Sequence, residues 1–188
     1  SQQVLADVSL FYGDYDRLVT FVAGTPGPDT TPVPNLTLPF VYQNAFEAET
    51  YGGELALTWE ATDQLRVMPR YSFFEEANRR ATQTGAALYP GGSRTPRHQA
   101  ILRCQWTPAP NWDVDAAGYY RDRVQDSPAI DAFVRLDLRV AWRPNPNTTI
   151  SLVGQNLLNA RQAEGEDQFV PQPNEIPRAV VFGFTTRF

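Results

Sequence analysis

Arginine and aspartate residues recur at alternate positions of several extended segments, where side chains of opposite charge could pair, hold a ligand or face water. In the clearest segment, Arg135, Asp137 and Arg139 alternate with apolar residues such as Val134 and Leu136. Successive side chains of a β-strand point to opposite faces, so this segment has a charged face and an apolar face. The same pattern elsewhere gives a charged set of Arg66, Arg70, Arg103, Asp113, Asp115, Arg135, Asp137, Arg139 and Arg187.

The environment of this charged set follows from energetics if the segments lie in a membrane. An arginine on the lipid side near the bilayer midplane costs roughly 2–4 kcal/mol. Turned inward, the same residues meet water and each other, so we expect the set to be lumen-facing in a β-barrel. For any single residue the favoured interpretation is a structural ladder of cross-strand ion pairs, each worth a few tenths to ~1 kcal/mol.

A second group of basic and aromatic residues surrounds the segment Glu76–Arg97. Such groups suit an anionic iron chelate, which they can bind through charge and stacking. The alternatives are a solvated loop, or arginines that bind lipopolysaccharide phosphate at an outer rim. The residues of this candidate ligand loop are Arg79, Arg80, Tyr89 and Arg94, with Arg97 at its end.

Residues suited to catalysis are sparse. His98 is the single histidine of the chain and stands at the start of a predicted strand. Ser72 or Ser93 could approach it across neighbouring strands, but a serine–histidine pair needs a third orienting group. The sequence has no nucleophile-elbow motif of the G-x-S-x-G kind. We therefore expect no catalytic residues and no enzyme activity.

Metal, cofactor and nucleic-acid binding are not expected either. The sequence has no His/Cys cluster, and Cys104 is the only cysteine, so no internal disulfide can form. The acidic pair Glu75-Glu76 and the group Glu164, Glu166 and Asp167 lie at the edge of, or within, predicted loops and lack the glycine-centred spacing of a calcium-binding EF-hand. The formal net charge is −5, whereas a surface that binds phosphates is basic.

Eight amphipathic strands are predicted to position these residues. The apolar fraction is 42% and the mean hydropathy is −0.39, and no run approaches the ~20 apolar residues of a membrane helix. A transmembrane barrel remains compatible with these values because its lipid-facing and lumen-facing residues alternate. The predicted strands are Leu5–Leu18, Val41–Glu60, Leu65–Glu75, His98–Trp106, Trp112–Asp122, Ile130–Trp142, Thr148–Leu157 and Arg178–Phe188.

The connections alternate between long and short. The short ones are Ala61–Gln64, Thr107–Asn111 and Arg143–Asn147, and the longer ones include Val19–Phe40 and Leu158–Pro177. Short periplasmic turns and long extracellular loops are typical of bacterial outer-membrane barrels, whereas nothing forces this alternation in a soluble sandwich or a lipocalin-like barrel. The segment Val19–Phe40 is so rich in proline and glycine that we expect no packed element there.

All four tryptophans stand beside the short turns. An amphipathic ring is best placed where hydrocarbon meets water, so tryptophans at one end of a strand set indicate a membrane girdle. This interpretation makes the short-turn end the periplasmic one. The alternative is four core tryptophans that happen to end strands. The expected periplasmic girdle consists of Trp59, Trp106, Trp112 and Trp142.

Several segments resemble the C-terminal β-barrel portion of a TonB-dependent outer-membrane receptor. They are Gly154-Gln155-Asn156-Leu157-Leu158-Asn159, Ile176-Pro177-Arg178, Phe182-Gly183-Phe184-Thr185-Thr186-Arg187-Phe188, Phe11-Tyr12-Gly13-Asp14-Tyr15-Asp16, Glu49-Thr50-Tyr51-Gly52-Gly53-Glu54-Leu55 and Arg97-His98-Gln99-Ala100. The resemblance covers essentially the whole chain. It implies a bacterial outer-membrane location and import of a ferric siderophore or a nutrient such as cobalamin. The charged set would then line the wall against a plug or the substrate path.

The resemblance also implies a role for the last strand. Phe188, Phe184 and Phe182 share one face with Val180 and resemble the terminal strand that the outer-membrane assembly machinery reads. An exposed aromatic strand edge is suited to β-augmentation by a partner. The alternative is that these aromatic residues belong only to the lipid-facing surface.

The expected organisation is a single β-barrel region over residues 1–188. In the resembling family one chain makes a plugged barrel of about 22 strands, and TonB acts at a box near the plug. We find no plug, no such box and too few strands, so we expect a C-terminal part of a larger barrel with outer-membrane lipid as a partner. The alternatives are an autonomous eight-stranded outer-membrane barrel with a structural role or, less favoured, a lipid-modifying enzyme, and a soluble β domain.

Overall fold

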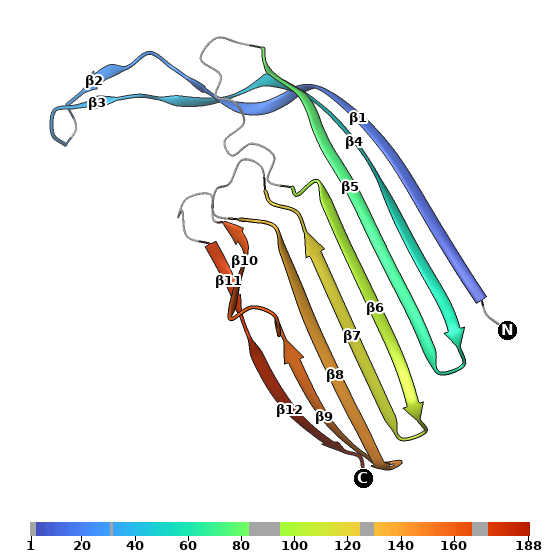
Figure 1. Ribbon diagram of the computed structural model, residues 1–188. Helices are drawn as coiled ribbons and strands as arrows, with labels where there is room; N and C mark the ends of the chain where they lie inside the picture. Colours follow the sequence, from blue (N-terminus) through green and yellow to red (C-terminus); the bar gives the residue numbers. More distant parts are fainter. Residues whose placement is uncertain (1–2, 31, 83–94, 125–129, 167–172) are drawn as a thin grey trace.

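The computed structural model describes residues 3–30, 32–82, 95–124, 130–166 and 173–188, and they form an all-β chain dominated by one antiparallel sheet. The sheet has eight strands in the order β1-β4-β5-β6-β7-β8-β9-β12, and Figure 1 shows it as a curved wall. Among the described residues no helix has the length and apolar character to span a membrane. The strands are β1 Gln3–Ala23, β4 Phe40–Thr62, β5 Leu65–Ala81, β6 His98–Ala109, β7 Trp112–Arg121, β8 Phe133–Asn145, β9 Thr148–Gln155 and β12 Ala179–Thr186.

The eight predicted strands are confirmed, and each pairs with its neighbour along the chain. The β4–β5, β6–β7 and β8–β9 turns lie at one end of the sheet together with both chain termini (Figure 1). Local side-chain hydrogen bonds explain two of these turns. The Gln64 N–H donates to the Thr62 hydroxyl at 3.2 Å, and the Asn147 N–H donates to Asn145 Oδ1 at 3.0 Å. Such bonds replace the ladder partners that a chain loses where it reverses.

The structure corrects the prediction that Val19–Phe40 contains no packed element. Strand β1 continues to Ala23, and the short strands β2 (Gly27–Asp29) and β3 (Asn35–Thr37) pair beyond it. This hairpin extends away from the main sheet (Figure 1). A two-stranded ribbon needs few ladder bonds, so it tolerates prolines that a central strand would exclude. Where β1 and β4 leave the sheet, a small core buries Val22, Ala45, Phe46 and Ala48.

A second hairpin lies inside the predicted loop Leu158–Pro177. It consists of β10 (Arg161–Glu166) and β11 (Pro173–Pro177). Alternation does not reveal it, because Arg161, Gln162 and Glu164 carry no apolar face. Its position depends on contacts with the main sheet and with the segment that follows β9, made by Glu164 and Ile176.

A glycine in β4 fixes how closely β1, β4 and β5 approach. A Cβ atom at Gly52 would lie 2.3 Å from the Phe73 carbonyl oxygen and 2.4 Å from Phe11 Cζ. We expect Gly52→Ala to lower the free energy of unfolding by about 1–2 kcal/mol, because backbone must shift to admit the methyl group. Gly118→Ala is the matched control in β7, since its nearest neighbour would be 4.0 Å away. Denaturant titration of both variants checks this, and equal midpoints would contradict it.

Candidate functional site

Most of the charged set predicted from the sequence lies on one face of the sheet, which we call the polar face. Residues directly opposite on paired strands share a face, and the register aligns Arg139, Asp115 and Arg66 in one row across β8, β7, β6 and β5. The next row contains Asp137 and Arg103, and the row after it contains Arg135 and Arg70. By alternation from these rows, one face carries Arg66, Arg70, Arg103, Asp113, Asp115, Arg135, Asp137 and Arg139. Arg187, the ninth of the predicted set, follows β12, and its backbone N–H donates to the Asn147 carbonyl oxygen at 2.9 Å.

Near the short turns these side chains pair with each other. Arg139 donates to Asp115 at 3.0 Å, and Arg103 lies 4.0 Å from the same carboxylate. Arg143 forms a bidentate pair with Asp113. At the β4–β5 end Arg66 donates to Glu60 at 2.6 Å. The part of the polar face near the short turns is therefore a ladder of cross-strand ion pairs. These side chains are half-exposed, so each pair contributes little to the free energy of unfolding.

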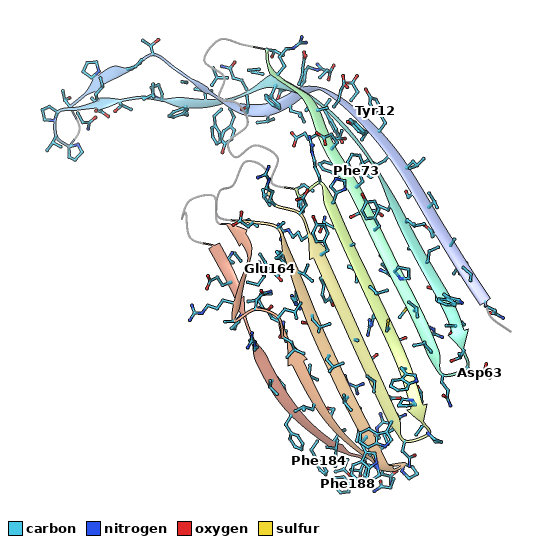
Figure 2. All side chains as sticks on the ribbon, in the orientation of Figure 1. Tyr12, Asp63, Phe73, Glu164, Phe184 and Phe188 are labelled. Carbon is cyan, nitrogen blue, oxygen red and sulfur yellow. The ribbon has the colours of Figure 1, made fainter. Side chains whose placement is uncertain are left out.

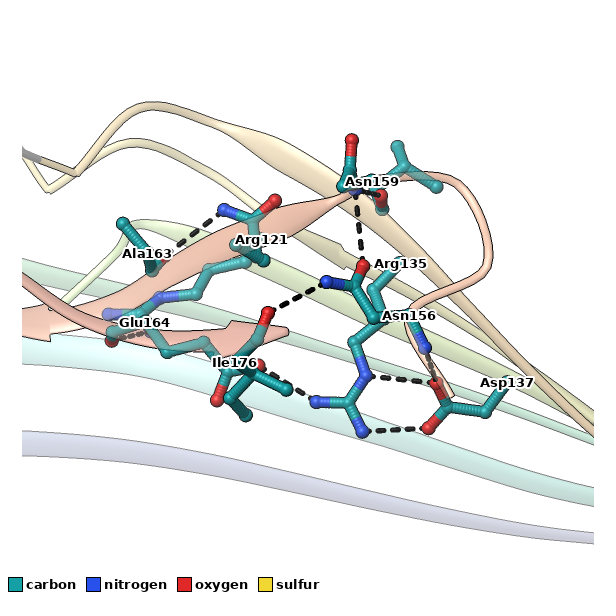
Figure 3. Close-up of polar contacts among 10 residues, drawn as sticks. Arg121, Arg135, Asp137, Asn156, Asn159, Ala163, Glu164 and Ile176 are labelled. Carbon is teal, nitrogen blue, oxygen red and sulfur yellow. Dashed lines mark hydrogen bonds and ion pairs between the residues drawn. The ribbon is translucent and has the colours of Figure 1, made fainter. Parts of the chain in front are cut away.

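Nearer the long loops the polar face carries a more buried cluster around Arg135. Its guanidinium donates to both carboxylate oxygens of Asp137, at 3.0 and 2.7 Å, and to Glu164 at 2.8 Å. It also lies 5.0 Å from the centre of the Tyr119 ring. The Arg135 side chain is only 16% exposed, against 40% for Arg139. Figure 3 shows the guanidinium between the two carboxylates. It joins β8 to the β10–β11 hairpin.

Asn156 holds the chain between β9 and that hairpin. It is fully buried and has a positive φ of 52°. Its N–H donates to Asp137 Oδ1 at 2.9 Å, and its Nδ2 donates to the Ile176 carbonyl oxygen at 2.9 Å (Figure 3). Asn159 Nδ2 in turn donates to the Val134 carbonyl oxygen at 2.9 Å. Sequence reasoning singled out this Asn-Leu-Leu-Asn segment without finding that it folds the hairpin onto the polar face.

The opposite, apolar face carries the tryptophan row, defined as Trp59, Trp106, Trp112 and Trp142. Trp112 pairs with Trp142 across β7 and β8, and their rings stack with centroids 6.0 Å apart. All four rings are between 40 and 48% exposed, which contradicts the alternative that they belong to a core. The register places Phe184 and Phe182 of β12 on this face too, beside Ile150 and Leu152. Phe184 and Phe188 lie at the short-turn end (Figure 2).

A second aromatic row crosses the apolar face nearer the long loops, and sequence reasoning missed it. This upper aromatic row consists of Tyr12, Tyr51, Tyr71, Phe73, His98 and Tyr120. Figure 2 shows Tyr12 and Phe73 far from the short turns. The sequence spacing could have revealed this row, because Tyr51, His98 and Tyr120 each stand eight positions from a tryptophan on their own strand. Eight residues span about 26 Å at ~3.3 Å per residue, comparable with the ~25 Å apolar band of outer-membrane barrels.

The serine and histidine residues considered as a catalytic pair do not lie next to each other. Ser72 pairs with Gln99 on the polar face, whereas His98 pairs with Phe73 on the apolar face. His98 Nδ1 instead lies 2.7 Å from the Tyr71 hydroxyl, and Ser93 lies outside the described residues. Within the described part of the chain, no three His, Cys, Asp or Glu side chains are grouped so that they could hold a metal ion.

The candidate ligand loop is only partly described. Arg79 and Arg80 belong to β5 and not to a loop, which corrects the prediction that the strand ends at Glu75. Arg80 forms an ion pair with Glu47, and Arg97 pairs with Glu75. Two of the residues, Tyr89 and Arg94, lie outside the described residues.

Comparisons with known proteins agree on one family. Residues 1–157 match the family model "TonB dependent receptor-like, beta-barrel". Similar solved structures include the siderophore receptor PiuA from Acinetobacter baumannii (18% identity, TM-score 0.71, 97% of this chain and 26% of that chain) and the copper transporter OprC (14%, 0.59, 96% and 28%). The outer membrane transporter YddB from Escherichia coli is also similar (14%, 0.54, 97% and 29%).

No curated protein matches the sequence. The chain spans little more than a quarter of the length of the similar solved structures, between 26 and 29%. At identities of 14 to 18%, these structural similarities show a shared fold alone. The family model covers most of the chain, and it matches the strands that carry the polar face and the tryptophan row. The chain belongs to the TonB-dependent receptor family, and residues 1–157 match its β-barrel.

Proposed function

We propose that residues 1–188 form the C-terminal part of the barrel of a receptor that imports a ferric siderophore or a similar nutrient such as cobalamin. Receptors of this family are transporters and not enzymes, and they lie in the bacterial outer membrane. The observation that carries the proposal is a single sheet whose polar face is braced by ion pairs and whose apolar face bears two aromatic rows. The polar face would line the lumen, and the apolar face would contact outer-membrane lipid.

The two ends of the sheet support a larger barrel. Strands β1 and β12 end the strand order and do not pair with each other in the described residues. An unpaired strand edge in hydrocarbon costs several kcal/mol for each unsatisfied backbone group, so both edges need further strands. In an autonomous eight-stranded barrel β1 and β12 would pair directly. TonB would act through a plug domain outside residues 1–188, and the long loops would face the ligand.

The assignment of the two faces can be tested by labelling in β8. In a Cys104→Ser background, we expect Arg139→Cys to react with a membrane-impermeant thiol reagent in membrane-inserted protein. Leu138→Cys and Val140→Cys are the matched controls on the apolar face, and lipid should protect them. Equal labelling of all three positions, or a protein that stays soluble without detergent, would contradict the membrane assignment.

The last residue tests the proposed assembly signal. Phe188 is fully exposed at the end of the chain, and Phe182 and Phe184 are also exposed on the apolar face. We expect deletion of Phe188 to reduce the amount of receptor in the outer membrane, because the assembly machinery would lose its terminal aromatic contact. Phe188→Tyr is the control, since it keeps a terminal aromatic residue and the length of the chain. Fractionation and immunoblotting measure the effect, and unchanged insertion would remove the signal interpretation.

Transport itself is tested in cells that lack the gene. We expect them to lose uptake of a ferric hydroxamate, a ferric catecholate or cyanocobalamin, and to regain it with the gene on a plasmid. Uptake should depend on TonB, because the energy reaches the outer membrane through it. Unchanged uptake of all three ligand classes in the deletion strain would contradict the nutrient proposed for this receptor.

A further inference from the structure

The apolar face contains a hollow in the interior of the sheet. It has a volume of about 450 Å³ and crosses the strands from β4 to β8, so neither end strand of the sheet borders it. Arg70, Ile101 and Tyr119 also border it, but by alternation their side chains belong to the polar face. The side chains of the apolar face that line it include Leu55, Tyr71, Leu102, Tyr120 and Val134.

The floor of the hollow depends on Gly118 of β7. The register places Gly118 beside Leu102 of β6. A Cβ atom at Gly118 would have no heavy atom nearer than the Leu102 carbonyl oxygen, at 4.0 Å, apart from its chain neighbours. The side chains around it are large, and Leu102 and Tyr120 are 50 and 40% exposed. The absence of a side chain on β7 therefore leaves an open space between larger neighbours.

The hollow lies in the half of the apolar face nearer the long loops. Along β7, Gly118 stands two positions from Tyr120 of the upper aromatic row and six positions from Trp112 of the tryptophan row. Two residues of a strand span about 6.6 Å. Since long loops are extracellular in barrels of this kind, the hollow would open into the outer leaflet, just inside its aromatic boundary.

A fatty acyl chain suits this hollow better than water or protein does. Of the lining side chains on the apolar face, only those of Tyr71 and Tyr120 carry a polar atom, and the Tyr71 hydroxyl lies 2.7 Å from His98 Nδ1. A bound water needs about two to four polar partners, which this lining does not offer. An empty hollow would forfeit the carbon contacts of its walls. Within lipid no hydrophobic effect draws two protein surfaces together, whereas acyl chains surround this face.

We propose that the hollow over Gly118 binds a fatty acyl chain of an outer-leaflet lipid. The inference rests on the proposed function, because it assumes that the apolar face contacts outer-membrane lipid. The hollow is continuous with that face. A chain lying in it contacts protein on its sides and at the floor, whereas a chain on the flat part of the face contacts protein on one side. Many small dispersion contacts add up, so the hollow is occupied more often than the flat surface.

Photochemical cross-linking of the full-length receptor in lipid vesicles tests the proposal. The vesicles are phosphatidylcholine that includes molecules with a photoactivatable diazirine in one acyl chain, and mass spectrometry locates the cross-links. In the natural protein we expect cross-links at Leu102 and Val134. Gly118→Leu fills the hollow, so it should lower the yield at these two residues by about threefold, because the chain loses its contacts with the floor and walls.

Ala116→Leu is the matched control. Ala116 lies two positions from Gly118 on the same face of β7 but does not line the hollow. It should leave the yield at Leu102 and Val134 unchanged. An equal yield in the natural protein and Gly118→Leu, or an equal loss in Ala116→Leu, would overturn the proposal.

Two further outcomes separate this proposal from the proposed function. Cross-links at Leu138 but not at Leu102 and Val134 would mean that protein covers the hollow, for example a second copy of the receptor. That result would overturn the lipid site and leave the membrane assignment intact. The absence of lipid cross-links along the whole apolar face would contradict the membrane assignment itself.

Discussion

Replacing Arg135 with glutamine is expected to lower the free energy of unfolding of the receptor by about 3 kcal/mol. Arg135 is the only cation between Asp137 and Glu164 in the described cluster, and its side chain is 16% exposed. Its removal would leave two partly buried carboxylates close together without a counter-charge, and breaking a buried pair in this way is costlier than losing an exposed one. Denaturant titration in detergent, followed by tryptophan fluorescence, measures the change.

The control for Arg135 is its neighbour two positions along β8. Arg139 pairs with Asp115 but is 40% exposed, so we expect Arg139→Gln to change the free energy of unfolding by less than ~1 kcal/mol. The two variants remove the same charge from the same face, and they differ in burial and in the contact with the hairpin. If both variants lose the same stability, the Arg135 cluster is only another part of the exposed ladder.

The Arg135 variant should also change one local observable. Amide hydrogen exchange in β10 and β11 should accelerate, since Glu164 would lose its charged partner on the sheet and the hairpin would open more often. Glu164→Gln should reproduce this acceleration with a smaller loss of global stability, because Asp137 keeps Arg135. Unchanged exchange in both variants would mean that the Asn156 hydrogen bonds alone hold the hairpin.

The faces of the sheet could be predicted because charged and apolar residues alternate along its strands. Charges such as Arg139 and Asp115 cannot face hydrocarbon at tolerable cost, so the two-residue period of the strands assigns every neighbour to a side. This argument does not need to know which strand pairs with which, or how far apart two segments lie. It therefore predicted the eight strands and the charged set, although strand ends such as Ala23 and Ala81 lay beyond the predicted ones.

What the sequence did not reveal depends on contacts between distant segments. The β10–β11 hairpin has no apolar stripe, and its place is decided by Glu164 meeting Arg135 and by Ile176 meeting Asn156. No periodicity encodes such pairs. The upper aromatic row was missed for another reason. Its tyrosines and His98 are scattered along the chain, and only the register shows that they gather in three successive rows of the apolar face.

Asn156 gives the second large effect, and a pair of substitutions separates its two causes. We expect Asn156→Ala to lower the free energy of unfolding by about 3 kcal/mol. Part of this follows because alanine lacks the short polar side chain whose local hydrogen bonds let asparagine adopt a φ of 52°. The rest follows because the Ile176 carbonyl oxygen, in a partly buried hydrogen bond, loses the Nδ2 donor.

Asn156→Gly removes the same side-chain hydrogen bonds but adopts a positive φ without strain. It should therefore be more stable than Asn156→Ala by about 1 kcal/mol, although still less stable than the natural protein. Denaturant titration of the two variants measures this order. If glycine and alanine were equally destabilising, the left-handed backbone at Asn156 would contribute nothing. If glycine restored full stability, the bond to Ile176 would not hold the hairpin, and Arg135 would be its main attachment to the sheet.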